Sequence, residues 1–165
     1  MLDGSGATLY GSLVRTLALA LATVGGIGYL PIASGTAGAL VALPLLPLLA
    51  AVCARSLGLY VVTVVGVVAV AVWAAGRAEV ILGGHDHSAI VVDEVAGLVV
   101  AGCFVPGTWR AAGLAFVLFR LFDIWKPFPA DRIDSGVAGG LGVVGDDLVA
   151  GAYAGLVARG ILAVL

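Results

Sequence analysis

The stretch LGLYVVTVVGVVAVAVWAA, residues 57–75, contains no charged side chain. A helix needs about 20 predominantly apolar residues to cross the hydrocarbon core of a bilayer, and this stretch meets that length. Its apolar residues are continuous rather than alternating with polar ones, which favours a helix over a strand. Because only helices and closed barrels satisfy their backbone hydrogen bonds in lipid, the stretch predicts a transmembrane helix.

The composition of the whole chain agrees with this prediction. Of 165 residues, 62% are hydrophobic and 11% are charged, whereas ordinary soluble domains are about half apolar and a quarter charged. The 25 glycines are compatible with membrane helices, in which small residues let backbones approach closely. The net charge of −2 gives no basic surface for nucleic acid. The excess of apolar residues makes the membrane the expected partner.

Six apolar segments occur along the chain and predict an all-α integral membrane protein, a compact bundle of about six hydrophobic helices. The second segment contains Pro44 and Pro47 and is expected to be kinked. The fourth and fifth are short and carry charges, which indicates a re-entrant helical hairpin around Pro106–Gly107. The segments cover roughly residues 13–30, 37–54, 57–75, 89–105, 111–125 and 147–165.

The chain shows no internal repeat and no linker, so we expect one domain over residues 1–165. Residues 1–12 are expected to form an N-terminal tail. Residues 126–146 are rich in glycine and proline and are expected to form a long loop. Because structureless loops of this length within a compact domain are usually functional or disordered, this loop is a candidate part of a site.

Alternation of the segments places most of the unusual polar residues on one side of the membrane. If all six segments cross and each reverses direction, the starts of the fourth and sixth segments lie at the same surface as the end of the fifth. This convergence is the strongest sign of a functional site in the residues themselves. The side chains concerned are Asp93, Glu94, Arg120, Asp123, Asp146 and Asp147.

The two acidic pairs are candidate ligands for a divalent cation. Asp93 and Glu94 lie within an apolar segment, where adjacent carboxylates repel each other unless they are protonated or share a cation. The alternative is an acidic helix start that faces water, and Asp146 and Asp147 could likewise be helix caps. Hard oxygen ligands select Mg²⁺, Mn²⁺ or Ca²⁺, and Mg²⁺ commonly combines one or two carboxylates with substrate phosphate oxygens.

Basic side chains near these acids are candidate phosphate ligands. Arg120 and Asp123 share a helix face and could form a simple ion pair. Alternatively, Arg120 and Lys126 bind phosphate while Asp123 binds metal or acts in catalysis. His85 could bind a ligand or lie in a solvated loop, and Thr36 opens a helix whose N–H groups could bind an anion or could simply be capped.

In these stretches the sequence resembles the phosphatidylglycerophosphatase A family. The matching stretches occur in the family's order and span about residues 30–151. Ala39 and Ala138 depart from it, where Ser and His are frequent. The stretches are Pro31-Ile32, Gly35-Thr36-Ala37-Gly38, His85-Asp86-His87, Ile90-Val91 with Asp93-Glu94 and Gly97, Phe119-Arg120 through Phe122-Asp123, Lys126-Pro127-Phe128-Pro129, Asp134, Gly139-Gly140-Leu141-Gly142, and Asp146 through Gly151.

The resemblance implies a Mg²⁺-dependent, membrane-embedded phosphatase domain that converts phosphatidylglycerophosphate to phosphatidylglycerol and inorganic phosphate. It also implies a multi-pass protein of a prokaryotic inner membrane with a site facing the cytoplasm. The basic residues are distributed over both sides, so the positive-inside rule does not determine this orientation. Together, residues and resemblance assign catalysis to Asp93 and Asp123, phosphate binding to Arg120, Lys126, Thr36 and His85, and metal binding to Glu94, Asp146, Asp147 and Asp123.

Three alternatives stay open at this stage. Intramembrane carboxylates serve transport as readily as hydrolysis, so a small ion or proton-coupled transporter is the rival function. Hydrolysis could proceed by direct attack of water or through an aspartyl-phosphate on Asp93 or Asp123. Gly151 and Gly155 form a GxxxG pattern that could pack within the chain or between chains, so the oligomeric state is open.

Overall fold

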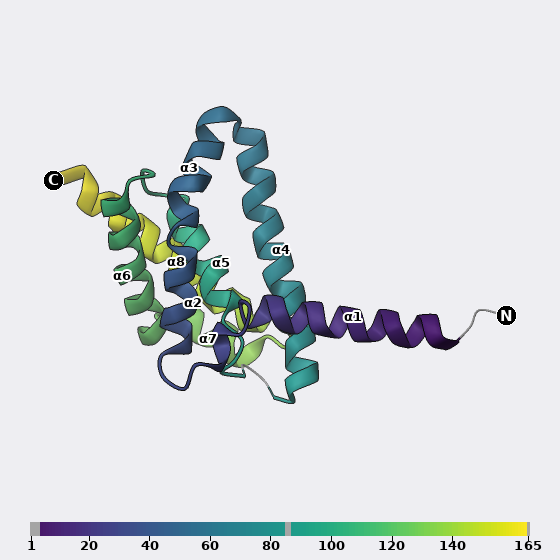
Figure 1. Ribbon diagram of the computed structural model, residues 1–165. Coiled ribbons are helices and arrows are strands. Elements are labelled where there is room, and N and C mark those ends of the chain that lie inside the picture. Colours follow the sequence, from purple (N-terminus) through teal and green to yellow (C-terminus); the bar gives the residue numbers. More distant parts are fainter. Residues whose placement is uncertain (1–3, 85–86, 165) are drawn as a thin grey trace.

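The computed structural model describes residues 4–84 and 87–164, and this part of the chain is all-helical, as expected (Figure 1). The helices pack into a bundle from which one helix projects. In chain order they are α1 (Gly4–Ala22), a 3-10 turn (Ile27–Tyr29), α2 (Ser34–Ala42), α3 (Leu45–Arg55), α4 (Leu57–Leu82), α5 (Val92–Gly102), α6 (Trp109–Trp125), α7 (Ala130–Gly136) and α8 (Gly140–Val164).

Three apolar helical stretches of the described chain are long enough to cross a membrane. They are Ser34–Arg55, which comprises α2 and α3, then α4 and α8. The first is broken between α2 and α3, where Leu43 and Leu46 donate their N–H groups only three residues back, to Leu40 and Leu43. Pro44 has no N–H to continue a regular helix, so the expected kink is confirmed.

The hairpin of α5 and α6 is shorter than a span. The 11 residues of α5 and 17 of α6 correspond to about 16 and 25 Å of helix, against about 30 Å of hydrocarbon. The connection passes through Pro106 and Gly107, as predicted. Helix α5 lies inside the bundle against α2, α4, α6 and α8, and its Leu98 and Val99 are fully buried.

Helix α1 differs from the prediction at both ends. It begins at Gly4, so the described part of the expected 1–12 tail is helical. Once a helix is nucleated, each added residue contributes one hydrogen bond, which favours extension toward the N-terminus. It ends at Ala22 rather than near residue 30, since Gly25 and Gly26 take positive φ angles of 68° and 100°. Figure 1 shows α1 running across α4 and away from the bundle, so the first apolar segment does not lie alongside the other helices.

The expected loop at 126–146 contains α7 and the first turns of α8 instead. Gly139, with φ of 75°, makes the turn into α8, but Gly140 serves close packing. A Cβ on Gly140 would collide with the carbonyl oxygen of Val72 in α4. Because α8 starts at Gly140, Asp146 and Asp147 lie in its second turn and are not helix caps.

A stripe of small residues holds α5 and α8 together in parallel. A Cβ on Gly151 would collide with the carbonyl oxygen of Gly97, and one on Gly155 would lie 2.6 Å from that of Ala101. The contacts advance in the same direction along both helices, so their N-terminal ends meet at the same end of the bundle. The GxxxG pattern therefore packs within the chain.

This stripe also explains why the two acidic pairs meet. Asp93 precedes Gly97 by four residues, and Asp147 precedes Gly151 by four. Residues four apart lie on the same helix face, so each aspartate continues its stripe by one turn toward the N-terminus. Close backbone packing at the glycines thus brings Asp93 and Asp147 together.

Candidate active site

A polar cavity of about 320 Å³ lies where the N-terminal ends of α2, α5 and α8 meet the C-terminal end of α6. It brings together both acidic pairs and the basic residues of α6, which confirms that these side chains converge. Its polar and glycine lining consists of Ser34, Gly35, Ser88, Asp93, Glu94, Arg120, Asp123, Lys126, Asp146 and Asp147.

Three carboxylates form the centre of this cavity. Asp93, Glu94 and Asp147 each offer an oxygen, and these atoms lie within 4.8 Å of one another. The two aspartates are buried, and the Glu94 N–H donates to Oδ1 of Asp93 over 3.0 Å. Oε2 of Glu94 is buried and accepts no hydrogen bond from the described residues. An oxygen-only set with such an orphaned acceptor fits a hard divalent cation.

The electrostatics of Glu94 point the same way. Burial raises the pKa of its carboxyl group, and the nearby Asp123 raises it further. The hydrogen bond with Asp93 and the charge of Arg120 act in the opposite direction but do not cancel the rise. A cation at the carboxylates would favour their ionised forms, so binding of a metal relieves the conflict that burial creates.

Arg120 joins the acidic centre to the rest of the cavity. One terminal nitrogen bonds the carboxylate of Asp123, one helical turn further on, and lies 3.7 Å from Oε1 of Glu94. The expected ion pair therefore exists. Nε of Arg120 is buried and has no hydrogen-bond partner among the described residues. Since a guanidinium carries five donors, Arg120 keeps donors for a phosphate oxygen while it holds Asp123.

Lys126 reaches the cavity from the end of α6. It closes the helix in the left-handed conformation, with φ of 45°, and its N–H bonds the carbonyl of Phe122. Its Nζ lies 2.8 Å from Oδ2 of Asp146. Of the acids assigned to the metal from sequence, Asp123 and Asp146 thus contact basic groups. Asp93, predicted to be catalytic, lies with Glu94 and Asp147 in the three-carboxylate centre.

The start of α2 contributes differently from the prediction. Ser34 and Gly35 line the cavity, whereas Thr36 is not among its lining residues. A Cβ on Gly35 would collide with Oε1 of Glu94, so this glycine makes room for the carboxylate. Its neighbour Thr36 is half-buried in the first turn of the helix.

Two serines at the edge of the cavity were missed from the sequence. Ser34 donates its hydroxyl to the carbonyl of Ser88 over 3.1 Å and ties α2 to the segment before α5. Their position beside predicted helix starts was the available signal. The predicted phosphate ligand His85 lies outside the described residues.

Known proteins with similar sequences include two phosphatases that carry the same name. The family model described as Phosphatidylglycerophosphatase A matches residues 20–162. The chain is 35% identical over 127 residues to Phosphatidylglycerophosphatase A of Escherichia coli (strain K12), which covers 76% of this chain and 72% of that protein. It is 42% identical over 77 residues to the Haemophilus influenzae protein of the same name, which covers 46% and 47%.

A relative with a different name also matches. The chain is 35% identical over 134 residues to a putative phosphatidylinositol-3-phosphatase of Bacteroides thetaiotaomicron, which covers 78% of this chain and 82% of that protein. No solved structure matches the chain.

Proposed function

Since this chain belongs to the phosphatidylglycerophosphatase A family and is therefore a phosphatase, we propose that it hydrolyses the terminal phosphomonoester of phosphatidylglycerophosphate with the help of Mg²⁺. The products would be phosphatidylglycerol and inorganic phosphate. The observation that carries this proposal is the polar cavity in which Asp93, Glu94 and Asp147 converge beside Arg120 and Lys126.

We assign the metal to the three carboxylates of the centre. Asp93, Glu94 and Asp147 offer only oxygen, which suits Mg²⁺. When bound, the cation supplies neutralisation of phosphate charge and activation of water. Asp146 and Asp123, the other predicted ligands, orient Lys126 and Arg120 through their ion pairs.

The basic residues and the remaining acids then have distinct roles. Arg120 and Lys126 bind the phosphate oxygens that the cation leaves free, since phosphoryl transfer depends chiefly on positioning and charge neutralisation. In hydrolysis, an oxygen of water bonds to phosphorus while the bond from phosphorus to the glycerol oxygen breaks. Asp123, which lies outside the metal centre, or the second carboxylate oxygen of Asp93 accepts a proton of that water, and the departing glycerol oxygen takes up a proton to become a hydroxyl.

The competing covalent route differs in forming an intermediate. Direct attack of labelled water places ¹⁸O in the released phosphate within a single turnover, but so does hydrolysis of an aspartyl-phosphate at phosphorus, so the label alone does not separate the routes. The covalent route is distinguished by an acyl-phosphate on Asp93 or Asp123 that can be trapped. Trapping it would overturn direct attack.

The decisive experiment is phosphate release from phosphatidylglycerophosphate by the purified full chain, with Mg²⁺ and with a chelator. We expect release only with the metal. Asp147→Asn should lose most turnover, while Glu79→Gln, a change from carboxylate to amide on α4 outside the cavity lining, should retain it. Metal-independent release, or full activity of Asp147→Asn, would contradict the proposed centre.

Phosphatidylinositol 3-phosphate is a second candidate substrate because of the Bacteroides thetaiotaomicron relative. The same assay with this lipid in parallel separates the two headgroups. We expect the glycerol phosphate headgroup to be preferred, in keeping with the name that both other relatives carry. The rival transporter function is disfavoured by the family and by the paired basic groups, which suit an anionic phosphate.

The family also supports a bacterial membrane as the location, with the cavity facing the cytoplasm as we propose. The three candidate spans support membrane association but carry no direction. Orientation is therefore tested separately, by labelling from either side of the membrane.

A further inference from the structure

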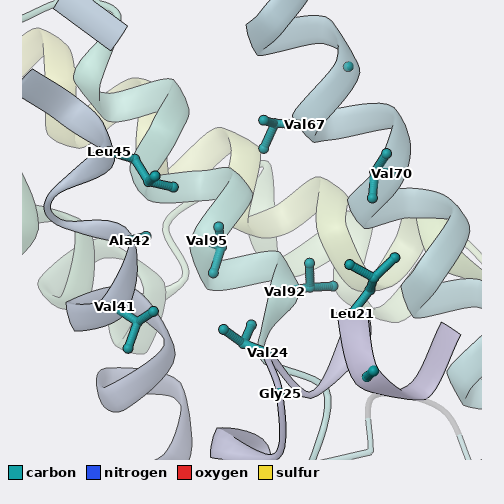
Figure 2. A pocket seen from close by; sticks show the side chains of 12 residues that line it. Leu21, Val24, Gly25, Val41, Ala42, Leu45, Val67, Val70, Val92 and Val95 are labelled. Atoms are coloured by element: carbon teal, nitrogen blue, oxygen red, sulfur yellow. The ribbon is translucent and has the colours of Figure 1, made fainter. Parts of the chain in front are cut away.

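A second, apolar cavity of about 560 Å³ lies between α1, the α2–α3 stretch, α4 and α5 (Figure 2). Figure 2 shows Val67 and Val70 of α4 facing Val92 and Val95 of α5 across it, with Val41 on a third side. All the described lining residues are apolar or glycine. The cavity therefore offers nothing to an ion, a headgroup or a peptide backbone, each of which needs polar partners.

The surroundings of this cavity are hydrocarbon. Two of its walls belong to stretches long and apolar enough to cross the membrane, and several wall residues are open to the outside, Val41 and Val70 by 48% and 45%. Water does not reach this depth of a bilayer, and an unfilled space would forfeit van der Waals contacts along its lining. Hydrocarbon is therefore the chemistry that fills it.

The cavity continues as a groove along the α3–α4 hairpin. Leu45 and Val67 also line a further apolar cavity of about 220 Å³ that reaches Val52 and Thr63. The hydroxyl of Thr63 donates to the carbonyl of Leu59, so it presents no free donor to the groove. From Val70 to Thr63 the groove follows two turns of α4, or about 10 Å. A narrow, extended apolar space suits one hydrocarbon chain.

The same face of α2 connects this groove with the polar cavity. Ser34 and Gly35 line the polar cavity, and Val41 and Ala42, two turns later, line the apolar one. Seven residues of helix separate the two sites by about 10 Å. In phosphatidylglycerophosphate, nine bonds join the terminal phosphorus to the central carbon of the acylated glycerol. At the extension of a peptide chain, roughly 3.5 Å for every three bonds, they also reach about 10 Å.

We propose that one acyl chain of the phospholipid substrate occupies this groove while its terminal phosphate lies in the polar cavity. The inference rests on the proposed function and adds to it that the enzyme recognises its lipid at two places. Gly38 packs on Val91 between the two cavities, so the headgroup passes outside this α2–α5 contact, along the exposed side of Val41. Binding of the acyl chain in the groove then positions the lipid substrate, whereas a deacylated headgroup is bound by the polar cavity alone.

Gly66 of α4 offers a test that adds bulk without strain. It lines the cavity, and a Cβ there would meet nothing within 4 Å. Gly66→Phe places a ring in the groove and improves the local helix propensity. Gly160→Phe is the matched control, because Gly160 is also helical with open space at its Cβ but lies at the far end of α8, outside the groove.

Each variant is assayed with the dioleoyl lipid and with the same headgroup lacking both acyl chains. We expect Gly66→Phe to lower kcat/KM for the dioleoyl lipid about tenfold or more, the range seen for a misfit in an apolar pocket. The rate with the deacylated headgroup, and both rates of Gly160→Phe, should match those of the unchanged enzyme. Unchanged turnover of the dioleoyl lipid by Gly66→Phe, or an equal loss on both substrates, overturns the proposal.

Failure of the proposed function looks different, since the unchanged enzyme would then release phosphate from neither substrate. A photoactivatable diazirine on the acyl chain of phosphatidylglycerophosphate identifies the occupant. We expect cross-links within Leu57–Leu82 that an excess of unlabelled substrate suppresses. If only a photoactivatable phosphatidylcholine forms cross-links there, the groove holds a lipid that is not the substrate. Protection of the groove on dimerisation would assign it to a second copy. Both results overturn the proposal.

Discussion

Replacement of Gly97 by alanine should disable the site although it changes no polar side chain. A Cβ on Gly97 would lie 2.7 Å from the carbonyl oxygen of Asp147, against the 3.4 Å at which ordinary contact begins. Helices α5 and α8 must therefore separate locally by about 0.7 Å, and the ring of Phe119, which is closer still at 2.5 Å, must also move. Overpacking of this kind costs about 1–3 kcal/mol, and a misplacement near 1 Å can lower turnover about 100-fold.

The assay compares Gly97→Ala with Gly160→Ala in phosphate release, Mg²⁺ titration and resistance to denaturant in detergent. Gly160 has open space at its Cβ, so alanine there should be neutral or stabilising by up to about 1 kcal/mol. We expect Gly97→Ala to lower kcat about 100-fold and to raise the Mg²⁺ requirement. If it bound Mg²⁺ and turned over like the unchanged enzyme, close packing of α5 and α8 would not be what positions the carboxylates.

Three further predictions address single side chains of the cavity. Glu94→Gln should raise the Mg²⁺ concentration for half-maximal activity, and an unchanged titration would remove Glu94 from the ligands. Lys126→Gln should raise KM by about tenfold or more while Mg²⁺ binding persists, because hydrogen bonds to charged groups contribute about 1.5–3 kcal/mol; loss of metal binding alone would contradict this. Ser88→Cys, with Cys53 and Cys103 replaced by alanine, should resist an impermeant thiol reagent in intact cells and react after lysis; labelling in intact cells would place the cavity outside.

The sequence predicted those features that follow from composition and alternation. A charge-free stretch at 57–75 is enough to predict α4, and the proline pair is enough to predict the break between α2 and α3. The convergence of the acids needed only the correct relative directions of α5, α6 and α8. It does not depend on whether α1 crosses the membrane, because α1 contributes none of those side chains.

The ambiguous signal was glycine, which permits both turns and close helix packing. Gly139 and Gly140 are adjacent, yet the first turns the chain and the second packs against Val72. Local sequence does not distinguish these uses, because the second depends on a helix some 70 residues away. For this reason the start of α8 was placed seven residues too late, and Asp146 and Asp147 were considered as possible caps.

The pairing of acids with bases was equally invisible in the sequence. Lys126 meets Asp146 because it ends α6 in the left-handed conformation and so directs its ammonium group to α8. Spacing alone gives Lys126 no preference among the five acids of the cavity. Whether Asp146 remains for a metal therefore depends on the backbone conformation of Lys126.

The charges of the cavity impose an order on binding. Five carboxylates and two basic side chains line it, a formal charge of −3 when all are ionised. A phosphate monoester adds further negative charge, and like charges in a partly buried site repel strongly. One divalent cation lowers the formal charge to −1, and the N-terminal ends of α2 and α5 add partial positive charge. We therefore expect Mg²⁺ to bind first and inorganic phosphate to compete with substrate only in its presence.

Calorimetric titration of the purified chain with phosphate, with and without Mg²⁺, tests this order. Phosphate that binds equally well in a chelator would show that Arg120 and Lys126 suffice, and the three carboxylates would then need a different explanation.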